Sequence, residues 1–263
     1  MKDSPDLPAS DAAETGYDSP NHSQLSYGKK TIHLIGTAHV SDSSAVEVVQ
    51  AIEALQPDAV CVELCQSRYQ AIKHNQTLDL RRLIKLIRDG RAEVVVANLL
   101  MGGYQRRIAS QLGVQPGGEM IAAIRAAERA GARLVLADRP IHITLRRLTG
   151  ALPAWKLGLL GVGLGLSMAF KKVGVTSEQV EAIKEQRELD QMMEQFRKEL
   201  PEVAEVLLEE RDKYLAMKIR DAPGKNILAV VGAGHVAGIT EHLHSTIDRR
   251  SLEALPKRRL RLF

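Results

Sequence analysis

The stretch Thr31–Ser44, TIHLIGTAHVSDSS, decides the fold of this 263-residue chain. Its first half is apolar apart from one histidine, so it predicts a short buried strand that ends at Gly36. His39 follows three residues later. A second stretch near the other end has the same form, because the apolar run NILAVV (226–231) is followed by Gly-Ala-Gly-His (232–235). The sequence therefore contains two Gly-x-x-His turns, each at the exit of a predicted strand.

Two further apolar stretches predict strands that end in polar residues. Residues 59–64, AVCVEL, carry Glu63 near their C-terminal end, and residues 133–137, RLVLA, are followed directly by Asp138 and Arg139. Helical patterns separate the four predicted strands, and such strands usually run parallel. We therefore expect an α/β fold with a mainly parallel central sheet and flanking helices.

The exits of these strands carry groups that bind metals and activate water. In a parallel sheet the carboxyl ends of the strands meet at one edge, so we expect His39, Glu63 and His235 to emerge together. Two imidazoles and a carboxylate are a common ligand set for a divalent cation that keeps a position open for water. The pattern predicts metal-dependent hydrolysis. Without a metal, either histidine would serve as general base with Glu63 orienting it, and this alternative stays open.

The acidic residues at these exits also have purely structural interpretations. Glu63 can pair with Arg68 in the segment that follows it, and Glu119 opens a predicted helix, where the helix macrodipole favours an acid. Asp138 and Arg139 can form a salt-bridged turn. For Glu63 the functional interpretation is favoured, since acids at such positions are often part of a site.

The glycines after the last predicted strand also resemble a dinucleotide-binding turn. That fold needs a further strand that carries an acid for the ribose. Only about 25 residues follow Gly238, and they are basic and without a strand pattern. This interpretation is therefore disfavoured.

The two ends of the chain differ in composition from its middle. Residues 1–28 are rich in Asp, Ser, Pro and Asn and carry a net charge of −4, so we expect them to be disordered. Residues 29–248 are expected to form one α/β domain. Residues 249–263 form a basic tail with six basic residues and one acid. A solvated terminus and a contact with an anionic membrane surface or an acidic partner are both open for this tail.

A helical insertion is expected at about residues 150–221. Two charged helices within it, about 176–200 and 201–220, are predicted to form a long antiparallel hairpin. The run before them, LGLLGVGLGLSMAF (157–170), is 14 residues long. A membrane-spanning helix needs about 20 residues, so a buried helix or a homo-oligomer contact is favoured over a segment at the membrane surface.

Composition limits the classes of partner and the compartment. Aromatic residues make up 3% of the chain, which leaves few platforms for stacking bases, so no nucleic acid is expected. Cys61 and Cys65 lie about 13 Å apart if extended, too far to form a disulfide. The N-terminus lacks the apolar region of a signal peptide. A cytoplasmic location is expected, with membrane association as the alternative.

Six motifs stand out along the chain: GTAHVS (36–41), CVELCQSRY (61–69), PGGEM (116–120), ADRPIHITLRR (137–147), EERD (209–212) and VVGAGHVAGI (230–239). In order and content they resemble the TraB/PrgY family of pheromone-shutdown proteins, which is related to the Tiki metallopeptidases. The resemblance covers about residues 30–247.

The resemblance implies an erythromycin-esterase/ChaN-like fold and, by analogy with the Tiki branch, a metal-dependent peptidase that acts on short peptides. His39, Glu63 and His235 would then be the catalytic residues and the ligands of Mn²⁺, Co²⁺ or Zn²⁺. The residues expected to contact the substrate are Arg68, Glu119, Asp138, Arg139 and Arg211. TraB-like proteins are mostly described as regulators, so the alternative is a non-catalytic module that binds or sequesters peptides in pheromone-type signalling.

Overall fold

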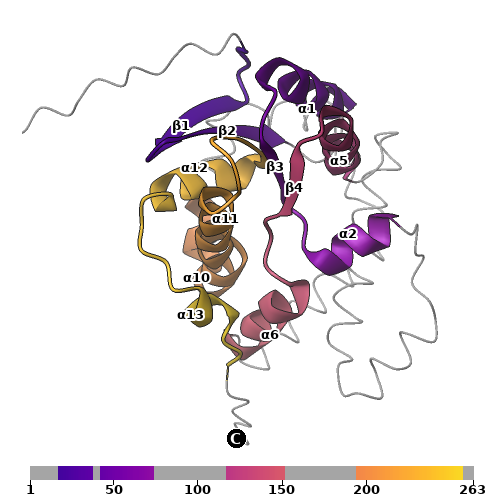
Figure 1. The fold of residues 1–263 in the computed structure, drawn as a ribbon. Helices are drawn as coiled ribbons and strands as arrows, with labels where there is room; N and C mark the ends of the chain where they lie inside the picture. Colours follow the sequence, from indigo (N-terminus) through magenta and orange to yellow (C-terminus); the bar gives the residue numbers. More distant parts are fainter. Residues whose placement is uncertain (1–16, 38–41, 74–116, 152–193, 257–263) are drawn as a thin grey trace, which may run out of the picture.

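The computed structural model of this protein describes residues 17–37, 42–73, 117–151 and 194–256. Within them, five strands form one sheet in the order β1-β2-β5-β3-β4. β2, β5, β3 and β4 are parallel, and β1 is antiparallel to β2 (Figure 1). The predicted α/β fold with a mainly parallel sheet is confirmed. The strands are β1 (His22–Tyr27), β2 (Lys30–Thr37), β3 (Ala59–Val62), β4 (Arg133–Leu136) and β5 (Asn226–Gly232).

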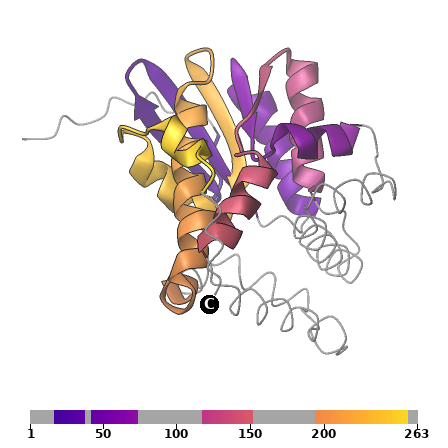
Figure 2. The ribbon, with the colours of Figure 1, turned by 90° about the horizontal axis from the view of Figure 1, so that it is seen from below.

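Helices cover both faces of this sheet. Figures 1 and 2 show the C-terminal helices, coloured orange to yellow, on one side of the sheet and α1 and α5 on the other. The described helical elements are α1 (Asp42–Leu55), α2 (Gln66–Lys73), α5 (Gly118–Ala130), α6 (Ile141–Ala151), α10 (Pro201–Ala204), the π-helical turn η1 (Glu205–Glu209), α11 (Glu210–Arg220), α12 (Ala233–His242) and α13 (Arg249–Glu253).

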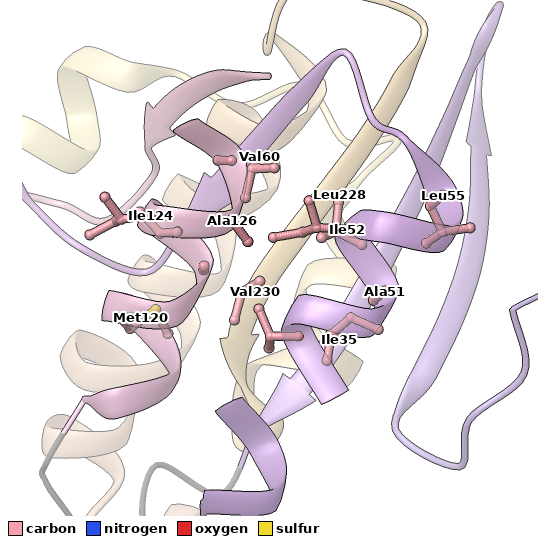
Figure 3. Close-up of a cluster of buried hydrophobic side chains, with 14 of the residues drawn as sticks. Ile35, Ala51, Ile52, Leu55, Val60, Met120, Ile124, Ala126, Leu228 and Val230 are labelled. Carbon is pink, nitrogen blue, oxygen red and sulfur yellow. The ribbon is translucent and has the colours of Figure 1, made fainter. Parts of the chain in front are cut away.

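Alternate strand residues build one core on each face. On the face of α1 and α5, Ile35, Val60 and Leu228 pack against the helices (Figure 3). On the other face, Leu34 and Ala229 belong to the core that α11 and α12 cover. Because both faces of β2, β3 and β5 are covered, the central residues of these strands are apolar apart from His33, and this is the pattern from which they were predicted.

The disorder predicted for residues 1–28 is wrong for the part that the structure describes. β1 is an edge strand whose side chains are only half buried, so it carries no apolar run that would have indicated it. Polar contacts also hold this segment in place: Glu47 of α1 accepts hydrogen bonds from Ser19 and, at 2.9 Å, from Asn21.

The predicted boundary between the domain and a basic tail at residue 249 is also wrong. Arg249–Glu253 form α13, and Leu252 is 6% exposed. Its side chain packs with Tyr214 and Met217 of α11. The fold therefore extends through α13, and the remaining tail residues 257–263 lie outside the described part of the chain.

The helical insertion is only partly described. Pro201 does begin a helical segment that ends at Arg220, as predicted. This segment is not peripheral, because Leu215 and Ile219 are fully buried in the core of the sheet. The apolar run 157–170 and most of the first predicted helix lie outside the described residues. Among the helices that are described, none is long and apolar enough to cross a membrane.

A histidine pair, His22 and His33, joins β1 to β2. His33 is fully buried, and its Nδ1 lies 2.9 Å from Nε2 of His22. Burial, together with the neighbouring His22, lowers the pKa of His33 from 6.5 to about 4. In the unfolded chain the imidazole of His33 takes up a proton near pH 6.5, whereas in the folded protein it does so only near pH 4. The free energy of unfolding is therefore expected to fall by about 3 kcal/mol as the pH drops through this window.

Urea unfolding at pH 7 and pH 4 measures this effect. His33→Gln, which removes the titrating group, is expected to lose most of the pH dependence that the wild-type chain shows. His244→Gln changes an exposed histidine and serves as the matched control. An equal pH dependence in wild type and His33→Gln would contradict the assignment.

Candidate functional site

The two Gly-x-x-His motifs begin on neighbouring strands. β2 and β5 run parallel, and Gly36 pairs with Val231 while Thr37 pairs with Gly232. Both motifs therefore leave the sheet at the same edge, as the predicted topology requires. His39 itself lies outside the described residues.

The glycine of the first motif makes room for the helix of the second. A Cβ on Gly36 would lie 3.0 Å from Cγ2 of Val236 and 3.3 Å from Cα of Ala233, both in the first turn of α12. Contacts of that kind are tighter than side chains normally make. The absence of a side chain at Gly36 thus lets the start of α12 pack directly on β2.

Glu63 connects three elements at this edge. It follows β3 directly and is 5% exposed. Its Oε2 accepts a hydrogen bond from the backbone N–H of Gly232 at 2.7 Å, and its Oε1 accepts one from Nη2 of Arg211. Nε2 of His235 lies 3.5 Å from the same Oε1. The exits of β3 and β5 and the start of α11 therefore meet at this carboxylate.

A second carboxylate holds His235 from the other side. Asp212 of α11 is fully buried, and its Oδ1 lies 2.5 Å from Nδ1 of His235. Burial raises the pKa of Asp212, although the hydrogen bond to His235 acts in the opposite direction. A carboxylate at one ring nitrogen fixes the orientation of an imidazole, and here it leaves Nε2 facing Glu63. Asp212, His235 and Glu63 thus form one continuous line of polar contacts.

Asp212 is the site residue that the sequence reasoning missed. Its signal was present, because Leu215, Ala216 and Ile219 mark the buried stripe of α11, and Asp212 continues that stripe at helical spacing. An acid on the apolar stripe of a helix indicates a buried partner.

Asp138 and Arg211 form the outer half of the cluster. Arg211 donates to both oxygens of Asp138, through Nε at 3.1 Å and Nη2 at 3.0 Å. Burial acts to lower the pKa of Arg211, but the charges of Asp138 and Glu63 outweigh it and raise that pKa. Nη1 of Arg68 lies 3.8 Å from Asp138, and its side chain is 45% exposed. Arg211 therefore neutralises two buried carboxylates, while Arg68 lies at the rim.

A profile of the TraB/PrgY/gumN family matches residues 21–248, a span that contains every residue of this cluster. The chain belongs to this family. The TraB domain-containing proteins of Homo sapiens and Mus musculus are each 32% identical over 251 residues, a stretch that covers 86% of this chain and 66% of each relative. The uncharacterized protein MJ1365 of Methanocaldococcus jannaschii is 33% identical over 250 residues, covering 87% of this chain and 58% of that protein. The match therefore covers less than two thirds of the length of each of these relatives.

Two of the predicted substrate residues of this TraB-family chain lie elsewhere. Arg139 is 1% exposed, and its guanidinium contacts Glu210 and Thr144 in a separate buried network. Glu119 is 2% exposed in the first turn of α5, the helix that covers the face opposite α11. The structure brings Glu63, Asp138, Arg211 and His235 together, with Arg68 beside them.

The donor set of the TraB-family cluster fits part of a metal site. No three His, Cys, Asp or Glu side chains in the described ranges are arranged to hold an ion, and the predicted third ligand, His39, is outside them. The 3.5 Å between Nε2 of His235 and Oε1 of Glu63 matches the separation of about 3.4 Å expected for two ligands on one tetrahedral ion. The contact of Asp212 with the other ring nitrogen is typical of metal-binding histidines. Arg211 shares Oε1 and would compete with an ion.

Proposed function

We propose that this chain is a metal-dependent hydrolase that cleaves short peptides at the edge formed by the exits of β2, β3 and β5. One observation carries the proposal. The line Asp212–His235–Glu63 directs an oriented imidazole nitrogen and a buried carboxylate toward the same point, 3.5 Å apart. Groups arranged in this way bind a divalent cation or move a proton.

Each side chain has a distinct role in this proposal. His235 and Glu63, joined by His39 of the other motif, would hold Mn²⁺, Co²⁺ or Zn²⁺. A cation bound there supplies a water of lowered pKa and polarises a carbonyl oxygen. Asp212 fixes the ring of His235. Arg68, exposed at the rim and at 3.8 Å from Asp138, is suited to bind a carboxylate of the peptide.

A second function is favoured by the contacts of Glu63. Both of its oxygens already accept hydrogen bonds, one from Arg211 and one from the N–H of Gly232. A carboxylate held in this way also suits a non-catalytic module that binds or sequesters a peptide, as a regulator of pheromone-type signalling would. Calorimetry with peptides in the presence and absence of EDTA separates the two, because the affinity of such a module would not depend on metal.

Cleavage of a library of short peptides tests the hydrolase proposal. The full chain is incubated with Mn²⁺, Co²⁺ or Zn²⁺ or with EDTA, beside His39→Ala and His235→Ala, and His244→Ala serves as a control at an exposed histidine. Cleavage that requires metal and both motif histidines is expected. Absence of cleavage with every metal, or full activity in His235→Ala, would contradict the proposal, and metal-independent binding without cleavage would favour the second function.

Asp212→Asn is expected to weaken the affinity for Zn²⁺ by about 10–100-fold. The amide keeps the shape of the side chain but loses the charge that orients His235. Titration calorimetry on the purified chain measures the affinity. Asp221→Asn, at an exposed aspartate just after the same helix, is the matched control. Unchanged affinity in Asp212→Asn would remove Asp212 from the proposed site.

A cytoplasmic location is part of the proposal and is supported by Cys61 and Cys65, which are both buried and free. Contact with a membrane surface and homo-oligomer formation remain proposals that depend on residues 157–170 and on the tail. A deletion that tests the tail should begin at Lys257, since Leu252 belongs to the fold.

A further inference from the structure

Two neighbouring residues after β4 pair with two neighbouring residues at the start of α11. Asp138 pairs with Arg211, and Arg139 pairs with Glu210, with 2.5 Å between Nη1 and Oε2. The first pair reaches Glu63, whereas the second contacts the cluster through the backbone N–H of Arg139, which donates to Oδ1 of Asp138 at 2.7 Å. The second pair is nevertheless buried, since the side chain of Arg139 is 0% and that of Glu210 9% exposed.

The helical segment that carries Glu210 and Arg211 contains a π-helical turn. η1 (Glu205–Glu209) ends immediately before Glu210. A π-helical turn holds one residue more than an α-helical turn, so it rotates the following residues relative to those before it. π turns of this kind are frequent at functional sites.

Arg139 bridges this π turn. Its Nη2 donates to the carbonyl oxygen of Val206 inside η1 at 3.0 Å, and its Nη1 donates to the carboxylate of Glu210 just beyond η1. One rigid guanidinium therefore fixes a backbone group within the turn and a side chain after it.

Arg139 makes further hydrogen bonds through Nε and Nη1. Nε donates to Thr144 at 3.0 Å, and Nη1 also donates to the carbonyl oxygen of Leu252 at 3.2 Å. The carboxylate of Glu210 receives further hydrogen bonds from Arg147, one of them at 2.7 Å. A buried guanidinium with all its nitrogens in protein contacts is suited to hold structure in place rather than to bind a substrate.

We propose that Arg139 and Glu210 are positioning residues, whose pairing across η1 sets the rotation of α11 and so holds Arg211 on Glu63 and Asp212 on His235. Glu210, Arg211 and Asp212 are consecutive, and one residue of an α-helix corresponds to a rotation of about 100°. A change in the turn that moves Glu210 therefore turns Asp212 away from His235.

The hydrogen bond between Asp212 and His235 provides a direct readout. In the full chain labelled with ¹⁵N-histidine, the proton shared by Nδ1 of His235 and Asp212 is expected to give a strongly downfield NMR signal, assigned by its loss in Asp212→Asn. Arg139→Lys keeps the charge, but a single ammonium does not reproduce the planar fork that contacts both Val206 and Glu210. Loss or a clear upfield shift of the signal is expected in Arg139→Lys.

Glu210→Gln is the second variant, because it keeps the size of the side chain and removes only its charge. It is expected to shift the signal in the same direction as Arg139→Lys does. If Arg139→Lys does not fold, Glu210→Gln by itself tests the positioning role of the pair. Arg197→Lys is the matched control, since Arg197 pairs at 3.3 Å with Glu209 of η1 and not with Val206 or Glu210. Its signal should match that of the wild-type chain.

A folded Arg139→Lys or Glu210→Gln chain with an unchanged signal would overturn the proposal, even if its thermal stability were lower. The measurement requires neither metal nor peptide cleavage. Failure of the positioning role and failure of the proposed hydrolase are therefore distinguishable.

Discussion

Glu63→Gln is expected to reduce metal-dependent peptide cleavage by the folded chain strongly. The amide carries no charge, so it is a poor metal ligand and does not accept or orient a proton as a carboxylate does. The loss in kcat/KM is expected to be about 10²–10⁴-fold, the usual contribution of a positioned acid–base group. Rates measured on the best peptide of the library, at saturating metal, check this value.

The variant should remain folded because its neighbours keep other partners. Arg211 still donates to both oxygens of Asp138, and the amide oxygen of Gln can accept from the N–H of Gly232. Glu53→Gln, at an exposed glutamate of α1, is the matched control. A Glu63→Gln chain that cleaves at the wild-type rate would exclude Glu63 from the chemistry.

Gly238→Ala is expected to destabilise the fold by about 3 kcal/mol or more, the upper part of the range for overpacked cores. A Cβ on Gly238 would lie 2.1 Å from Oδ2 and 2.9 Å from Cβ of Asp212, so α11 and α12 could not keep their present separation. Relief by movement of Asp212 would break its contact with His235. Replacing glycine by alanine inside a helix ordinarily raises the free energy of unfolding by about 1 kcal/mol. A lower free energy of unfolding in Gly238→Ala would therefore indicate the clash by its sign alone.

Urea unfolding of Gly238→Ala and of Gly118→Ala measures the effect. Gly118 opens α5, and a Cβ there meets no atom within 4 Å, which makes it the matched control. In an Asp212→Ala background the cost of Gly238→Ala should shrink, since the clashing carboxylate is gone. Equal stability of Gly238→Ala and wild type would show that the close approach of the two helices is not required.

The sequence predicted the strands that carry an apolar run. The four parallel strands are short apolar runs, and each exit could be located from the polar residue that follows it, as with Glu63 and Asp138. β1 was not predicted because an edge strand needs no apolar run. The segment just before it is held by polar contacts instead, among them the hydrogen bond from Asn21 to Glu47. The helix that begins at Arg249 was not predicted because it lies in a basic segment and buries a single apolar residue, Leu252.

The site was predictable only in part, because the sequence locates the strand exits but not the contacts that each side chain makes. Strand exits place Glu63 and His235 by topology alone, but topology does not determine which way a side chain turns. Asp138 and Arg139 follow the same strand, yet Asp138 pairs with Arg211 beside Glu63, whereas Arg139 pairs with Glu210, and their position after the strand does not reveal this difference. Asp212 belongs to a helix about 150 residues away from Glu63, so its contact with His235 depends on packing that spacing does not reveal.

The most direct test of the central claim is the anomalous diffraction of crystals of the full chain grown with Zn²⁺. The account predicts a single strong peak at the exits of β2, β3 and β5, with Nε2 of His235 and a carboxylate oxygen of Glu63 about 2.0–2.2 Å from the ion and Arg211 moved off that oxygen. A chain saturated with Zn²⁺ that binds the ion elsewhere, with the pair of Glu63 and Arg211 intact, would contradict it.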